Sequence, residues 1–169
     1  MKKYFLFVIM LFSVNAFSQK FGYVNTEYIL SNIPNYEKAQ QQIDLISVEW
    51  QKEIEAKFAD IDRMYKEFQA EKVLLTEEMR IKREDEIIKK EKEAKELQKR
   101  YFGKDGDLFK KRQELVKPIQ DEVFNAIKEL AVEGNYAVIF DSSGGMNMLY
   151  TDPKYDKSDD VLKKLGYKN

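Results

Sequence analysis

The chain has 169 residues, 35% of them charged, and its 29 lysines and arginines against 30 aspartates and glutamates give a formal net charge of −1. Because it contains no histidine and no cysteine, a histidine-based catalytic triad, a thiol nucleophile, a zinc–thiolate site and a disulfide are excluded. The slightly acidic balance argues against nucleic acid as the main partner, since phosphate binding needs a basic field.

The first 18 residues are predicted to be a cleaved signal peptide. Lys2 and Lys3 precede an apolar run at positions 4–12, which is too short to span a bilayer comfortably. Ala16-Phe17-Ser18 places small residues where a signal peptidase reads, so cleavage is expected before Gln19; a retained membrane anchor is the alternative. Cleavage predicts a secreted protein with 27 basic and 30 acidic residues, a net charge of −3.

A short strand and a short helix are expected next. The aromatic and β-branched residues at 21–24 predict the strand. Asn25 is expected to cap a helix over 26–32, which Pro34 brings to a close. Asn35 is then expected to cap a long helix.

That helix is predicted to run to about Leu75, with charged or amide side chains between its apolar positions. From Ile54 to Phe68 the apolar steps alternate four and three, which is a heptad seam. A stripe this narrow predicts one partner helix and water on the other faces. The apolar positions are Ile43, Trp50, Ile54, Phe58, Ile61, Tyr65, Phe68 and Leu75.

A second helix is predicted from Thr76, as its cap, to about Glu133, where Gly134-Asn135 forms a left-handed end. With a turn near 73–76, the two helices form an antiparallel hairpin over residues 36–130. Two staggered seven-residue series give the second helix a wider stripe, which indicates a second neighbour or open apolar surface. The series are Ile87, Ala94, Tyr101, Leu108 and Leu115, and Ile88, Phe102, Phe109, Val116, Val123 and Leu130, the second of which is broken by Lys95.

Three residues weaken the second helix. Gly103 and Gly106 each cost about 1 kcal/mol relative to alanine in a helix, and Pro118 removes one backbone hydrogen bond and is expected to kink it. The seven-residue spacing passes in register through Phe102 and Phe109, so we predict a continuous but bendable helix with a hinge at Gly103, Gly106 and Pro118. A loop at 103–106 that splits the helix is the alternative. In a continuous helix, alanine at both glycines would be stabilising.

The last third is expected to complete a small β-containing body of residues 19–35 and 131–169. Residues 136–140 predict a buried strand, 141–145 a turn and 148–151 a second strand. Ser158 is expected to cap a final helix that ends before Gly166. The fold class is therefore α+β, with a small β body and a long antiparallel helical hairpin.

Two polar clusters could be mistaken for reaction sites. The stretch 141–145 could be a serine nucleophile loop or a calcium loop, but it lacks a base, the nucleophile frame and the alternating carboxylates, so a turn is preferred. Glu77, Glu78, Glu84, Asp85 and Glu86 alternate with basic residues on an exposed helix and predict solvated ion pairs. We therefore predict no catalytic residue, no cofactor and no metal site.

Aromatic residues are more numerous on the hairpin than one seam requires. Most are expected to hold the two helices together, and the surplus is typical of a sequence-tolerant binding surface. The candidates are Trp50, Tyr65, Phe68, Tyr101, Phe102 and Phe109.

The strand at 21–24 with its continuation to Leu30, the charged hairpin and the strand at 136–140 together resemble the Skp (OmpH) family of periplasmic chaperones. Lys117-Pro118-Ile119-Gln120 and the ending at 159–166 are also similar to that family. The resemblance implies a non-enzymatic, ATP-independent periplasmic holdase. Such a holdase keeps unfolded outer-membrane proteins from aggregating in a cavity between helical arms, which makes the six aromatic residues candidate client contacts.

The resemblance also implies a homotrimer. Three short strands in one chain would leave unpaired edges, so we predict that the bodies join through their strands. The predicted interface residues are Tyr23, Val24, Ile139, Phe140, Leu149 and Tyr150.

The charge of the chain departs from this pattern. The better-known relatives are strongly basic, whereas this chain is slightly acidic and has no basic cluster, so lipopolysaccharide or membrane contact does not carry over. The alternative function is a structural coiled-coil spacer of the cell envelope without clients.

Overall fold

The computed structural model describes residues 19–144 and 148–167, so the predicted signal peptide and Gly145 lie outside the described residues. The chain forms two units, one of residues 33–121 and one that combines residues up to 32 with residues from 122 onward. Within the described ranges, no helix is both long and apolar enough to cross a membrane.

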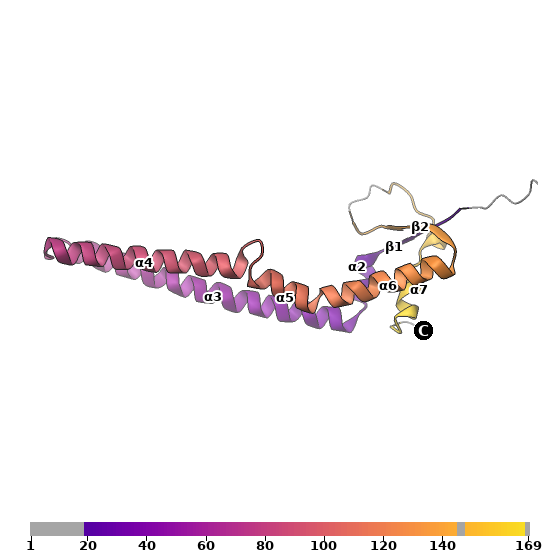
Figure 1. Cartoon of the computed structure of the whole chain (residues 1–169), viewed down its shortest axis with the longest axis horizontal. Coiled ribbons are helices and arrows are strands. Elements are labelled where there is room, and N and C mark those ends of the chain that lie inside the picture. Colours follow the sequence, from indigo (N-terminus) through magenta and orange to yellow (C-terminus); the bar gives the residue numbers. More distant parts are fainter. Residues whose placement is uncertain (1–18, 145–147, 168–169) are drawn as a thin grey trace, which may run out of the picture. The chain divides into compact units, whose positions relative to one another are not determined.

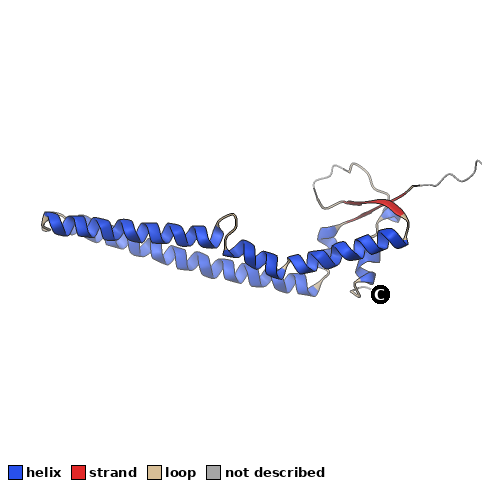
Figure 2. Cartoon of the chain, viewed as in Figure 1, coloured by secondary structure: helices blue, strands red, loops and turns tan. Residues whose placement is uncertain are grey.

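The first unit is built on an antiparallel pair of long helices, as predicted. Helix α3 spans Pro34–Glu71 and α4 spans Glu77–Phe102, and the two lie side by side (Figures 1 and 2). At ~1.5 Å per residue, α3 is about 57 Å long. The Thr76 hydroxyl accepts a hydrogen bond from the backbone N–H of Met79, which confirms Thr76 as the cap. The predicted cap at Asn35 is wrong: Pro34 already begins α3, because its fixed φ and missing N–H suit the first helical position.

Two buried clusters hold this unit together. One joins Ile61 and Phe68 of α3 to Ile87 and Ala94 of α4, with Ala94 completely buried. The other joins α3 to the helices that follow α4, and it contains Ala39, Ile43 and Val116 with Tyr36, Leu108, Leu115 and Ile119 around them. Among the apolar positions chosen from the sequence, Tyr65, Ile88 and Phe109 are exposed, whereas the following are buried: Ile43, Ile54, Ile61, Phe68, Ile87, Ala94, Tyr101, Val116 and Val123.

The predicted continuous second helix is wrong. Helix α4 ends at Phe102, and α5 (Asp107–Leu115) begins only after a loop at 103–106, which stands out from the helix pair (Figure 1). Gly103 and Gly106 take extended backbone angles, with ψ of 167° and 179°, and the N–H of Gly106 donates to the carbonyl of Gly103 over 2.9 Å. The seven-residue spacing in the sequence continues from Phe102 to Phe109 although residues 103–106 between them are not helical, so the spacing alone did not reveal the break.

A further interruption occurs near Pro118. Helix α5 ends at Leu115, Val116 follows, and α6 spans Lys117–Glu133. Pro118 thus stands in the first turn of a new helix, where its missing N–H costs nothing. At the far end of α6, Asn135 takes a φ of 51°, which confirms the predicted left-handed end.

The second unit contains one parallel strand pair, β1 (Lys20–Val24) and β2 (Tyr136–Asp141). Antiparallel strands can be joined by a tight turn, but a parallel pair needs a long crossover, which the intervening helices supply here. Around the pair lie α2 (Thr26–Ser31), the 3-10 turn η1 (Pro153–Tyr155) and α7 (Ser158–Lys164), with α2 packed on α7.

The predicted second strand at 148–151 is wrong for the single chain. These residues have no strand structure, and the side chains of Leu149 and Tyr150 are 99% and 84% exposed. The predicted turn at 141–145 is therefore not a turn between two strands. Instead, Ser142 hydrogen-bonds Val24 of β1, and the hydroxyl of Ser143 hydrogen-bonds that of Thr26 of α2. In addition, Lys157, not Ser158, caps α7.

Candidate functional site

One face of the two-stranded sheet is apolar and open. The register pairs Phe21 with Val138 and Tyr23 with Phe140, and because side chains alternate along a strand, all four lie on the same face. Phe21 and Val138 are 46% and 42% exposed. Val24 lies on the opposite face and is buried. The sheet therefore has one inner face and one face without a cover among the described residues.

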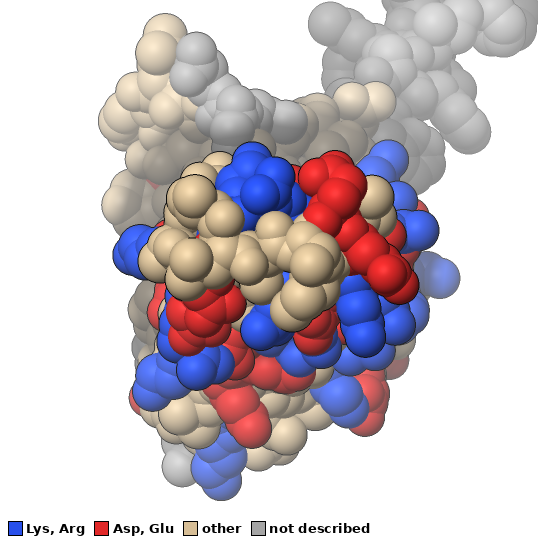
Figure 3. Space-filling view, turned by 90° about the vertical axis from the view of Figure 1, so that its left-hand side faces the viewer, with Lys and Arg blue, Asp and Glu red and all other residues tan. Residues whose placement is uncertain are grey.

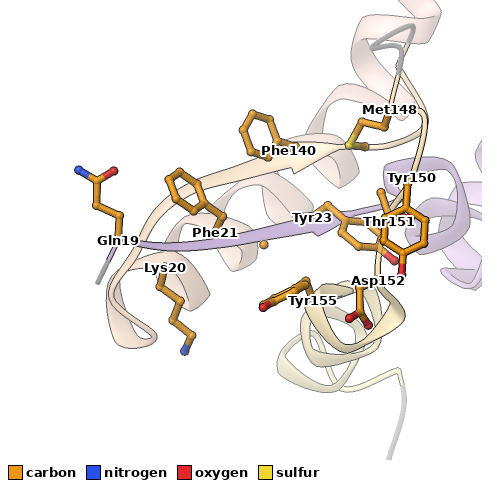
Figure 4. Close-up of a pocket in the computed structure, with 11 residues that line it drawn as sticks. Gln19, Lys20, Phe21, Tyr23, Phe140, Met148, Tyr150, Thr151, Asp152 and Tyr155 are labelled. Carbon is orange, nitrogen blue, oxygen red and sulfur yellow. The ribbon is translucent and has the colours of Figure 1, made fainter. Parts of the chain in front are cut away.

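A groove of about 660 Å³ runs along this open face. Figure 4 shows Phe21 and Phe140 on the neighbouring strands, with Met148 and Tyr150 of the following segment and Tyr155 of η1 around them. Aromatic surface of this kind, with few charges, is typical of protein contacts rather than of a reaction site.

The six predicted interface residues differ in burial and in whether they line the groove. Tyr23, Phe140 and Tyr150 line the groove. Leu149 is fully exposed beside it, whereas Val24 is buried within the subunit. Ile139 alternates with Phe140 and so belongs to the inner face of the sheet.

A polar network anchors the ends of both strands. The Asp141 carboxylate accepts hydrogen bonds from the hydroxyl of Thr26 at 2.6 Å and from the N–H and hydroxyl of Ser143 at 3.0 and 2.8 Å. Ser142 donates to the carbonyl of Val24 from its N–H and its hydroxyl. Burial alone would raise the pKa of Asp141, but the hydrogen bonds from Thr26 and Ser143 outweigh it and hold the pKa below its ordinary value. The serines of this stretch are thus structural anchors.

In the hairpin, an aromatic contact joins Trp50 of α3 to Tyr101 of α4. Their rings stack with centroids 4.4 Å apart and planes 10° apart. The Tyr101 hydroxyl donates to Glu53 over 2.8 Å, and the guanidinium of Arg100 lies 4.9 Å from the Tyr101 ring centre. The rings of Phe102 and Tyr101 form an edge-to-face contact, with their centroids 6.5 Å apart. Trp50 and Tyr101 are therefore largely occupied in joining α3 to α4, immediately before the 103–106 loop.

The remaining candidate aromatics differ in exposure. Phe68 is buried in the seam, whereas Tyr65 and Phe109 are 52% and 44% exposed. Two exposed isoleucines, Ile81 and Ile88, were not among the candidate client contacts and are 51% and 62% exposed. Ile88 begins the second seven-residue series found in the sequence, and Ile81, seven residues earlier, continues the same spacing toward the turn.

Many charged side chains on the hairpin surface form ion pairs. Lysines and arginines pair with acids three or four residues away, as in Arg80–Glu77, Arg83–Glu86 and Lys90–Glu93. Figure 3 looks onto the end of the hairpin and shows both signs of charge interleaved around a group of uncharged residues. Val73 and Leu74, at this turn, are 84% and 87% exposed. Exposed pairs of this kind contribute little to stability. In the described parts of the chain, no acidic residues gather in a group that could hold a metal ion.

Comparison with known proteins adds an independent line of evidence. The chain matches the family described as outer membrane protein (OmpH-like) over residues 20–165. It belongs to the OmpH family. The chain is 26% identical over 156 residues to the chaperone protein Skp of Vibrio cholerae serotype O1, covering 88% of this chain and 84% of the relative.

The fold is shared as well. A crystal structure of an OmpH-like outer membrane chaperone from Caulobacter crescentus CB15 superposes with a TM-score of 0.67 at 12% identity, covering 87% of this chain and 83% of the other. The OmpH (Skp) family consists of non-enzymatic chaperones of the periplasm. The sequence-based assignment of the family and of the fold is confirmed.

Proposed function

We propose that this protein is an ATP-independent periplasmic holdase, which binds unfolded outer-membrane proteins between helical arms and prevents their aggregation. The observation that carries the proposal is apolar surface left uncovered on an otherwise ion-paired hairpin, in a member of a chaperone family. A helix pair that served only as a spacer would need its seam and nothing more.

The proposal includes a homotrimer that forms through the β body. The open sheet face, with Phe21, Tyr23, Val138 and Phe140, leaves apolar area exposed in the single chain. Tyr150 and Leu149 are free beside the groove, and a second copy can use them to cover it. Native mass spectrometry at micromolar concentration tests this point, and a stable monomer would contradict it.

The proposal also includes export. The leader at 1–18 is removed before Gln19, and the body comprises residues 19–35 and 131–169 around an arm of 36–130. The loop at Gly103–Gly106 and the helix boundary at Pro118 serve as hinges that let an arm adjust to clients of different bulk.

The decisive experiment is suppression of aggregation. An unfolded outer-membrane β-barrel protein is diluted from urea, and light scattering is followed with and without the purified mature chain. We expect scattering to fall to near the baseline at a small molar excess of trimer, without ATP. Unchanged scattering would favour the alternative, a structural spacer of the envelope without clients.

A further inference from the structure

The residue that export would leave at the start of the chain lies at one end of the open sheet face. Gln19 precedes β1, is exposed, and lines the groove together with Phe21 and Tyr23. Side chains alternate along an extended chain, so these three positions share one face. Figure 4 shows the side chains of Gln19 and Phe21 on one side of β1 and that of Lys20 on the other. Cleavage before Gln19 would therefore place the new α-amino group at the end of the groove.

The charges along this groove are few. Among the described residues that line it, Lys20 and Asp152 are charged, and both have partners. The Lys20 ammonium donates a hydrogen bond to the carbonyl oxygen of Gly134 over 3.1 Å, and the Asp152 carboxylate pairs with Lys154 at 2.8 Å. A free α-amino group on Gln19 would add a positive charge, because its pKa of about 8 keeps it mostly protonated at neutral pH. A second copy that covered the groove would take this charge out of water, which is unfavourable.

An N-terminal glutamine can remove this charge by its own chemistry. The unprotonated α-nitrogen attacks the side-chain carbonyl carbon Cδ, a new amide bond closes a five-membered ring, and the Cδ–Nε2 bond breaks. The proton lost by the α-nitrogen leaves with Nε2 as ammonia, so the step needs no oxidant, reductant or further reactant. The product, pyroglutamate, is a neutral lactam.

We propose that Gln19 is a modification site, at which the mature chain carries pyroglutamate, and that the neutral ring completes the apolar face used between copies. The fold accommodates the ring, because sheet pairing begins only at Lys20, opposite Tyr136, and Gln19 itself is exposed. The lactam then continues the row of Phe21 and Tyr23, where a free amine would end that row with a charge. This inference rests on the proposed export and trimer, and it adds the chemical form of the first residue.

The first test is the mass of the mature protein purified from the native envelope. Mass spectrometry of the intact chain and of its N-terminal peptide distinguishes the two forms, since cyclisation lowers the mass by one ammonia. We expect the chain to begin at position 19 and to carry pyroglutamate there. A chain that begins with uncyclised Gln19, or at a later residue, would overturn the proposal, whereas an intact leader would count against export itself.

The second test measures the effect of the ring on assembly. Gln19→Asn is the matched variant, because asparagine keeps the side-chain amide but would have to close a four-membered ring, so its α-amino group stays free. A wild-type chain produced with one methionine before Gln19 cannot cyclise either. Each protein is diluted, and native mass spectrometry gives the concentration at which its trimer dissociates.

We expect both uncyclised chains to dissociate at a concentration about fivefold or more above that of the cyclised wild type, because their N-terminal charge has to be desolvated at the interface. Circular dichroism should give the same helix content for all three, since the exposed Gln19 lies outside the sheet pairing. Equal dissociation concentrations would overturn the role of the ring at the interface. A cyclised wild type that is a stable monomer at micromolar concentration would count against the proposed trimer itself.

Discussion

At the residue scale, a single carboxylate connects the ends of β1, α2 and β2. Asp141 receives the backbone N–H of Thr26 at 3.2 Å in addition to the hydroxyls of Thr26 and Ser143. Every donor that points at it favours the ionised form, which is why its pKa lies below the ordinary value in spite of partial burial. The sequence placed Asp141 in a turn, and only the parallel strand pairing brings Thr26 to it.

We expect Asp141→Asn to lower the free energy of unfolding by about 1 kcal/mol at pH 7, a value kept small because the carboxylate is partly exposed. Since the folded-state pKa is below that of the unfolded chain, the contribution is present in full above the unfolded pKa of about 4 and is lost as pH falls through the folded value. Urea unfolding at pH 7 and pH 3 checks this, and the gap between wild type and variant should narrow at pH 3. A gap of the same size at both pH values would show that the charge is not involved.

Tyr101 offers a second test at this scale, because Trp50 is the single tryptophan of the chain and stacks on it. Tyr101→Phe keeps the stack and removes the hydrogen bond to Glu53, so we expect a loss of about 0.5–1.5 kcal/mol with little change in tryptophan fluorescence. Tyr101→Ala removes both and should cost about 3–5 kcal/mol, with a red-shifted emission. Equal losses in the two variants would mean that the ring contact contributes nothing.

At the element scale, the long helices and their seam could be predicted from the sequence, because heptad spacing is a local signal that one partner helix satisfies. Ile54, Ile61 and Phe68 on one helix and Ile87, Ala94 and Tyr101 on the other are buried as the spacing indicated. Pairing of β1 with β2 depends on residues more than a hundred positions apart, and no local pattern distinguished it from a hairpin with 148–151. The apolar character of Leu149 and Tyr150 was taken to predict a strand, although among residues 19–144 and 148–167 no strand pairs with them.

The loop at 103–106 reverses the expected effect of alanine. A Cβ on Gly103 would lie 2.3 Å from the carbonyl oxygen of Lys99, and one on Gly106 would lie 2.7 Å from that of Arg100. Backbone atoms cannot move away as a flexible side chain would, so we expect Gly103→Ala with Gly106→Ala to destabilise the hairpin by about 1–3 kcal/mol. The sequence alone indicated stabilisation, because alanine is the better residue in an unbroken helix.

Thermal unfolding followed by circular dichroism checks this, with Lys104→Ala, an exposed residue of the same loop, as the matched control. The control should melt within about a degree of the wild type, since surface substitutions are close to neutral. A higher melting temperature for the glycine double variant would indicate that the helix is continuous in solution.

At the scale of the whole molecule, charge and apolar surface play separate parts. Acids and bases nearly cancel over the chain, and they pair locally along the helices, which leaves little net field to attract a distant partner. The uncovered apolar surfaces are the sheet face in one unit and exposed side chains of the hairpin, such as Tyr65, Ile81 and Ile88, in the other. Association through such surfaces depends on removal of apolar area from water, which salt does not weaken.

Client capture should therefore be only weakly sensitive to salt. If residues 1–18 are removed as proposed, the remaining charge of −3 offers no long-range attraction for acidic unfolded barrel proteins, and exposed charges are screened over about 8 Å at ~0.15 M salt. We expect the affinity for such a client to change by less than about threefold between ~0.02 M and ~0.15 M salt. Replacing the exposed Glu49, Glu67 and Asp85 by lysine changes the charge from −3 to +3, and this variant should lose affinity clearly over the same range. Titration of the client at each salt concentration by fluorescence anisotropy measures both proteins under identical conditions. A hundredfold loss for the wild type would mean that charge, not exposed apolar surface, captures the client.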